Sequence, residues 1–324
     1  MTHTVTVAVA VVAWMLTPLQ LAGPTGQKAG APSSTDALQL QVALDRAGFS
    51  PGEIDGRSGQ NTERALAAFR KARALPAGTA FDDEVRAALG EHLVEPLVQY
   101  TVTEADLEGP FADAIPADMM EQATLQALAY TSAWELLGER FHASPRLLQT
   151  LNAGKKLSAG REIRVPNVDP LVLPDRTGVR EQPPGATLPV ARIVVTAGEG
   201  GLVGRDAQDR VVFYAPVTVG GVQDPLPTGA WKVVEIFDRP IFNYNPDLFW
   251  DADPSHAKAR IAPGPNNPVG LIWIDLDLEN YGIHGTPEPS RIGRSQSHGC
   301  VRLTNWDVVR LAAMVAKNTS VVFE

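Results

Sequence analysis

The segment YGIHGTPEPSRIGRSQSHGCVRL, residues 281–303, carries the strongest indication of how this 324-residue chain folds and what it does. It contains two of the chain's six histidines, His284 and His298, and its single cysteine, Cys300. The cysteine follows the first histidine by 300 − 284 = 16 residues, and glycines stand at positions 285 and 299. One thiol excludes an internal disulfide framework and a cysteine-rich zinc site. The residues around Cys300 must therefore decide its role.

Three interpretations of this thiol compete. A free cysteine is often a buried, inert residue among apolar neighbours, but here histidine, glycine, arginine and serine surround it. Alternatively, His284, His298 and Cys300 could bind zinc, since three protein ligands and a water form a catalytic zinc site. In the third interpretation, Cys300 is a nucleophile and a histidine is its base.

The third interpretation needs a thiol, an imidazole and a glycine, and the segment contains all three. A free thiol has a pKa near 8.5, so only a few per cent is thiolate at neutral pH. An imidazole can take the thiol proton and later return it to a leaving amine. A glycine at 299 lets the backbone approach closely and orient amide groups toward a developing oxyanion. The segment therefore favours nucleophilic catalysis.

Residues 190–324, which contain this segment, resemble the L,D-transpeptidase catalytic domain of the YkuD type. The resemblance rests on His284-Gly285-Thr286 followed by Ser-His-Gly-Cys-Val-Arg-Leu at 297–303. Two flanking segments agree with it, the Leu-Pro-Thr-Gly turn at 226–229 and Gly-Pro-Asn-Asn-Pro-Val-Gly at 264–270. The family often has Thr-Pro-x-Gly at the first of these.

The resemblance implies a role for each residue of the motif. Cys300 would be the acylated nucleophile and His284 its general base, held by the backbone carbonyl of Gly285. His298 would shape the pocket, and the amides of Gly299 and Cys300 would form the oxyanion hole. Three further residues would lie on the substrate side. Arg302 would organise the site or hold a carboxylate, and Ser297 would support the loop. Thr286 is the third of them. Some family members have asparagine in place of Arg302. No metal and no cofactor are implied.

The implied reaction is an acyl transfer on peptidoglycan. Cys300 would attack the bond after the L-centre of a tetrapeptide stem, and the terminal D-residue would leave. An amine on a neighbouring stem would then take the acyl group and form a cross-link. Water as acceptor would make the enzyme an L,D-carboxypeptidase, and a protein amine would attach a protein to the wall. A wall-binding protein with an inactive domain and a thiol peptidase with a different substrate are the competing hypotheses.

The pattern around the motif predicts a multidomain α+β protein. Short β-branched runs separated by Gly and Pro indicate a mainly β, sandwich-like C-terminal domain over 190–324. They lie at 193–196, 211–214, 215–219, 230–236, 271–275 and 320–323. One amphipathic helix is expected at 305–317.

Residues 36–92 predict a small three-helix bundle. Apolar residues at helical spacing favour helices at 36–48, 61–74 and 83–89, with an Asp55-Gly56 turn after the first. This stretch resembles the peptidoglycan-binding domain found beside cell-wall hydrolases, although Arg70 stands where that family often has glutamine. A structural spacer is the alternative.

The middle of the chain has weaker patterns. Residues 98–168 predict a mixed module with helical periodicity over 124–151 and strands near 100–102 and 163–165. Its second half resembles a LysM-type glycan-binding module, from which the acidic insert at 104–123 departs. An irregular helical linker domain is the alternative. Six prolines between 166 and 189 favour extended chain, so residues 169–189 are predicted to be a linker.

The amino terminus and composition indicate the compartment. Residues 1–23 contain a twelve-residue apolar run at 5–16, too short for a membrane span but typical of a signal peptide. A Pro/Gly-rich linker is expected at 24–35. We therefore expect export to the periplasm or cell envelope, with no lipid anchor because no cysteine lies near the leader. A net charge of 28 − 37 = −9 makes a nucleic-acid partner a poor expectation.

Overall fold

A computed structural model describes residues 34–181, 188–198 and 200–324. The predicted leader at 1–23 and most of the linker at 24–35 lie outside these residues. Everything described below belongs to the unit formed by residues 31–324. Within the described residues, no helix is both long enough and apolar enough to cross a bilayer.

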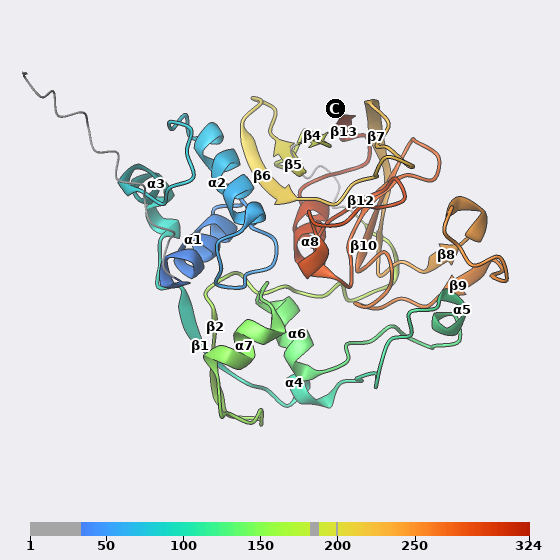
Figure 1. Ribbon diagram of the computed structural model, residues 1–324, viewed down its shortest axis with the longest axis horizontal. Helices are drawn as coiled ribbons and strands as arrows, with labels where there is room; N and C mark the ends of the chain where they lie inside the picture. The colour runs from blue at the N-terminus through green and yellow to red at the C-terminus, as the bar shows by residue number, and fades with distance from the viewer. Residues whose placement is uncertain (1–33, 182–187, 199) are drawn as a thin grey trace, which may run out of the picture. The chain divides into compact units, whose positions relative to one another are not determined.

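The C-terminal part is built on a curled mixed sheet (Figure 1). Among the described residues, nine strands join it, eight in the order β12-β11-β10-β7-β13-β4-β5-β6, with β3 pairing off this path with β7. The strands are β3 (Gly178–Val179), β4 (Arg192–Thr196), β5 (Gly201–Arg205), β6 (Val211–Pro216), β7 (Gly229–Asp238), β10 (Ile272–Leu276), β11 (Gly282–His284), β12 (Val301–Arg302) and β13 (Ser320–Phe323).

One helix and one long strand organise this sheet. The first half of β7 pairs with β13 and its second half with β10, so β7 connects the two halves of the sheet. Helix α8 (Asn305–Ala312) buries Trp306, Val308 and Leu311 against the apolar faces of the strands. Full burial of such side chains contributes about 1.5–3 kcal/mol each. The helix was predicted to reach residue 317, but it ends at Ala312, and the chain turns there toward β13.

Three helices form the N-terminal region, and α3 begins with a side-chain cap. They are α1 (Ser34–Arg46), α2 (Gln60–Ala72) and α3 (Asp83–Leu89), followed by the short 3-10 helix η1 (Gly90–His92). Asp82 caps α3 by accepting a hydrogen bond from the Val85 amide, which satisfies one of the unpaired amide donors of the first turn.

The α+β fold class is confirmed. Helix α1 begins two residues before the predicted position.

The middle region pairs two distant strands around two helices. Strand β1 (Leu97–Thr101) pairs antiparallel with β2 (Glu162–Pro166). Helices α6 (Ala133–Arg140) and α7 (Pro145–Leu151) pack beside them, each capped by a serine, Ser132 and Ser144. The single helical stretch expected over 124–151 is therefore two helices. The insert between β1 and α6 carries α4 (Ala105–Glu108) and α5 (Met119–Gln122).

The hydrophobic cores of the three regions each take in a few residues from a neighbouring region. Tyr214 of β6 packs into the core of the three-helix region, and Gly48 and Ser50 hydrogen-bond the Tyr214 backbone. The predicted linker at 169–189 is also partly built into the sheet, through β3 and buried Leu171. Prolines exclude a helix there, but they leave single extended residues free to pair. Residues on the two sides of the predicted boundaries therefore contact one another.

A short β arm extends from the curled C-terminal sheet and packs on the insert at 104–123. Strands β8 (Phe242–Tyr244) and β9 (Ala259–Ile261) pair with each other, with the 3-10 helix η2 (Pro246–Leu248) between them. Leu128, which follows the insert at 104–123, is fully buried against Tyr244 and Ile261, and Met119 and Met120 of the insert pack against the same cluster. The acidic insert, for which the sequence indicated no role, therefore packs under this arm (Figure 1).

Candidate active site

His284 lies in the interior of the sheet at the end of β11. Antiparallel β10 places Trp273 opposite it, and the imidazole stacks on the indole with centroids 5.4 Å apart. Parallel β12 lies on the other side, where Ile283 pairs with Val301 and His284 with Arg302. Since Cys300 directly precedes Val301, this parallel pairing brings the two halves of the motif together across 16 residues.

The hydrogen bond of His284 sets its tautomer. Its Nδ1 lies 2.7 Å from the carbonyl oxygen of Gly285. A carbonyl can only accept, so Nδ1 carries the proton and Nε2 is left as an acceptor. Burial, reinforced by the positive charge of Arg302, lowers the pKa of His284 to about 3. The imidazole is therefore neutral at physiological pH and able to receive a proton.

Cys300 is half-buried at the start of β12. Burial raises the pKa of its thiol, while the Gly282 backbone and the Arg302 charge oppose that shift. Sγ lies 3.7 Å from the carbonyl oxygen of Asn280. The thiol is thus neutral at physiological pH, and the neutral imidazole of His284 belongs to the paired strand β11. Deprotonation must then accompany attack, which is the task of a general base.

A glycine turn with positive φ directly precedes Cys300. Gly299 has φ +103°, and a Cβ added there would lie 2.9 Å from the ring of Tyr281. Only glycine adopts this conformation without strain. Ser297 Oγ donates to the Cys300 carbonyl over 2.6 Å, and its amide donates to Val219. Ser297 therefore lies where it supports the loop.

Arg302 and Thr286 border the same centre. Arg302 exchanges backbone hydrogen bonds with Thr218, and its charge acts on both His284 and Cys300. Within the described residues, its buried Nε has no hydrogen-bond partner. Thr286 is buried, and its hydroxyl accepts from the Glu288 amide. Its hydroxyl is thus engaged by the loop backbone.

His298 faces the β arm. Its Nε2 lies 2.7 Å from Asp251 Oδ1, and its ring contacts Phe249 and Trp250. Trp250 is 63% exposed, so a large apolar side chain stands open beside the motif. His298 therefore links the Cys300 turn to the arm between β8 and β9.

Two residues that no sequence pattern singled out hold the base in place. Asn305, the first residue of α8, lies against Gly285, where an added Cβ would be 2.2 Å from Asn305 Oδ1. That oxygen accepts the Leu271 amide at 2.9 Å, and Nδ2 donates to Glu139 at 2.5 Å. Glu139 belongs to α6, in the middle region. No local motif could have indicated this contact, because it joins residues 166 positions apart.

Within the described ranges, no set of three or more His, Cys, Asp or Glu side chains is placed to hold a metal ion. A cysteine thiol and a neutral imidazole on paired strands, with a glycine of positive φ directly before the cysteine, are groups that cysteine acyl-transfer enzymes use.

Comparison with known proteins narrows this class to one family. Residues 192–323 match the YkuD family, "L,D-transpeptidase catalytic domain", and residues 33–89 match the family "Putative peptidoglycan binding domain". "Putative L,D-transpeptidase YkuD" of Bacillus licheniformis is 30% identical over 172 residues, which are 53% of this chain and 78% of the relative. The Bacillus subtilis protein of the same name is 29% identical over 53% of this chain and 79% of the relative.

A solved L,D-transpeptidase from Xylanimonas cellulosilytica aligns with 91% of this chain and 96% of its own, at 16% identity and a TM-score of 0.37. From the sequence matches, the chain belongs to the YkuD-type L,D-transpeptidase family. It is an enzyme, and its two matched domains indicate peptidoglycan as the substrate.

Proposed function

We propose that this enzyme transfers the acyl group of a peptidoglycan tetrapeptide stem through a thioester on Cys300, with His284 as general base. The observation that carries the assignment is the hydrogen bond from His284 Nδ1 to Gly285, which leaves Nε2 free to accept. In the first step, the thiol proton passes to Nε2 as Sγ bonds to the stem carbonyl. The imidazolium then gives that proton to the departing amine of the terminal D-residue.

Charge that develops on the attacked carbonyl oxygen needs donors nearby. The amides of Gly299 and Cys300 are proposed to be these donors, because the positive φ of Gly299 turns the backbone at the nucleophile. Loss of one such donor typically lowers kcat by about 10²–10³-fold. The guanidinium of Arg302 adds a fixed positive charge beside the thiol, and it is proposed to hold a substrate carboxylate.

The second half-reaction hands the acyl group to an acceptor. We assign an amine of a neighbouring stem to this role. Neutral His284 can deprotonate that amine as it attacks, and the thiolate of Cys300 leaves and recovers a proton from the imidazolium. A cross-linked stem results. Water at the same position would give L,D-carboxypeptidase activity, and a protein amine would give attachment of a protein to the wall.

The regions before the sheet are proposed to hold the enzyme on the sacculus. Residues 33–89 match a peptidoglycan-binding family. The middle region, with β1 and β2 around α6 and α7, is proposed to be a LysM-like glycan-binding module. An enzyme of this kind works where peptidoglycan lies, so export to the periplasm or the cell envelope is part of the proposal.

Digestion of sacculi after incubation with the enzyme, followed by mass spectrometry, tests the reaction. New stem-to-stem cross-links and released D-residue are expected from the wild type, and neither from Cys300→Ser. Trimmed stems alone would favour the carboxypeptidase, and unchanged turnover by the serine variant would contradict the assignment of the nucleophile. Cys300→Ser should still sediment with sacculi, and its failure to do so would contradict anchoring.

A further inference from the structure

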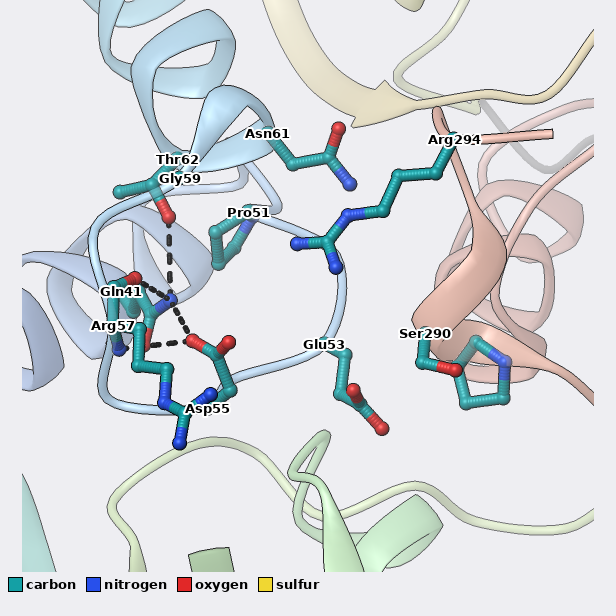
Figure 2. Close-up of a pocket in the computed structure, with 11 residues that line it drawn as sticks. Gln41, Pro51, Glu53, Asp55, Arg57, Gly59, Asn61, Thr62, Ser290 and Arg294 are labelled. Carbon is teal, nitrogen blue, oxygen red and sulfur yellow. Dashed lines mark hydrogen bonds between the residues drawn. The ribbon is translucent and has the colours of Figure 1, made fainter.

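The segment between strands β11 and β12 is irregular apart from the 3-10 helix η3 (Pro289–Arg291), so its position depends on contacts with other regions. One contact comes from the three-helix region, which faces residues 289–294 across a polar pocket (Figure 2). There Asn61 Nδ2 donates to the carbonyl oxygen of Ile292 at 2.9 Å. Ile292 lies 300 − 292 = 8 residues before Cys300. This hydrogen bond therefore leaves the turn at the nucleophile to be held by other residues.

Two residues hold the turn itself. Ser297 donates from its amide to Val219, and His298 contacts three consecutive residues of the β arm. Asp251 Oδ1 lies 2.7 Å from His298 Nε2. A carboxylate only accepts, so Nε2 carries the proton and donates to Asp251.

Two aromatic rings of the arm complete the contact with His298. Phe249 meets the imidazole edge-on with ring centroids 5.0 Å apart, and Trp250 lies tilted against it at 5.6 Å. The His298 side chain is 23% exposed, so the rings and the carboxylate enclose most of it. The imidazole is thus fixed both by direction, through the hydrogen bond, and by packing.

Solvent screens this contact less than an open surface pair. The same arm carries such a pair, Lys258 and Asp247, whose charged atoms lie 3.7 Å apart and whose side chains are 71% and 77% exposed. Fully solvated pairs contribute little to holding a structure in place. The arm therefore offers one contact that can hold the turn and one matched acidic residue that cannot.

The arm is itself anchored on the middle region. His256 Nδ1 lies 2.9 Å from the Tyr244 hydroxyl, and its Nε2 lies 3.0 Å from Asp118 Oδ2. The Leu128 amide donates to the carbonyl oxygen of Pro263, just beyond β9. Because these contacts fix the arm at its base, a side chain on the arm can fix the turn that it touches.

We propose that Asp251 is a positioning residue for the reaction, because it holds His298 and, through the backbone of Gly299, keeps Cys300 in the position from which it attacks. Gly299 has φ +103°, and a glycine has too much conformational freedom to keep a turn in one shape by itself. An imidazole fixed at the preceding residue supplies the missing constraint. This inference rests on Cys300 as the proposed nucleophile and adds to it a residue of the arm that acts on the rate.

Steady-state release of the terminal D-residue from purified tetrapeptide stems by the full chain tests this role. For Asp251→Ala we expect kcat to fall about tenfold with KM nearly unchanged, as the loss of one hydrogen bond that orients a reacting group would give. Asp251→Asn should recover most of the rate, because its amide oxygen can still accept from Nε2. Asp247→Ala, on the same arm, is the matched control and should keep the wild-type kcat.

A double-mutant cycle determines whether Asp251 acts through His298. In a His298→Ala background, Asp251→Ala should lower kcat by less than about twofold, because the contact is already lost. A loss of the same size in both backgrounds, or a wild-type kcat for Asp251→Ala, would overturn the proposal. A higher kcat would overturn it too, since the arm would then obstruct the site. A failure of the proposed acyl transfer would instead appear as absence of D-residue release by the wild type, so the two failures are distinguishable.

Discussion

Asn305 donates a hydrogen bond from Nδ2 to Glu139 across 2.5 Å, and so joins the catalytic helix α8 to helix α6 of the middle region. The other side of the Asn305 amide group rests on Gly285, whose carbonyl holds His284. Tyr130 donates to the second oxygen of Glu139. The middle region thus reaches His284 through an unbroken series of contacts.

Removing the Glu139 carboxyl should therefore slow turnover without weakening substrate binding. For Glu139→Ala we expect kcat to fall about tenfold, a change of about 1.4 kcal/mol in the barrier, with KM nearly unchanged. Glu139→Gln should recover most of the rate, because its amide oxygen can still accept from Asn305. The measurement is steady-state release of the terminal D-residue.

Glu121→Ala, in the exposed insert, is the control for that pair. A purely structural role would lower the melting temperature of Glu139→Ala and leave kcat of the folded fraction intact. That result would contradict positioning of His284 by Glu139.

The burial of His284 leads to a prediction about pH. Its pKa is lowered to about 3, whereas a solvated histidine titrates near 6.5. His284 should therefore stay neutral from pH 7 down to pH 5, and kcat/KM should show no ionisation of His284 near pH 6.5. An NMR titration of the His284 ring over that range should likewise show one neutral tautomer. An acid limb centred near pH 6.5, assigned to His284 by NMR, would contradict this description of the base.

The turn at Gly299 should accept no side chain. Gly299→Ala forces a Cβ against Tyr281 at a φ of +103°, so the turn must shift and carry the nucleophile with it. We expect a loss of at least about 100-fold in kcat, the size associated with a misplaced oxyanion donor. Gly154→Ala is the control, because Gly154 also has positive φ but nothing lies within 4 Å of the added Cβ. It should lose about 1 kcal/mol of stability at most and no activity. Equal activity of the two variants would refute the role of the turn.

The sequence was a good guide to the motif and a poor one to its supports. The segment 281–303 was recognised from its residue types, because that signal is local, but the short strands β11 and β12 beside His284 and Cys300 were not among the predicted strands. The contacts made by Glu139, Asn305 and Tyr281 are decided by packing between segments far apart in the chain, and periodicity carries no information about which faces meet. The same reason explains why Tyr214 could not be assigned from its strand pattern to the core of the helical region.

A buried charge cluster where three regions meet should dominate stability toward acid. Asp45 of α1 is fully buried and lies 3.1 Å from Arg310 of α8 and 3.0 Å from His142 of the middle region. Burial alone would raise the pKa of Asp45, but these two partners outweigh it and hold that pKa below the usual value of about 3.8. A depressed carboxyl pKa contributes stability that is fully present above the unfolded value and is lost as pH falls through the folded value. Its contribution is therefore constant above about pH 5 and declines below about pH 4.

Asp45→Asn should lower the free energy of unfolding by about 3 kcal/mol at pH 7, since it leaves a buried guanidinium without its counter-charge. The measurement is urea denaturation at pH 7 and at pH 3.5, where the difference from the wild type should shrink. Asp36→Asn removes the exposed partner of Arg86 and should change stability by less than about 1 kcal/mol at either pH. A difference between Asp45→Asn and the wild type that does not depend on pH would show that the cluster acts by packing alone, since only a titrating carboxylate can couple its contribution to proton binding.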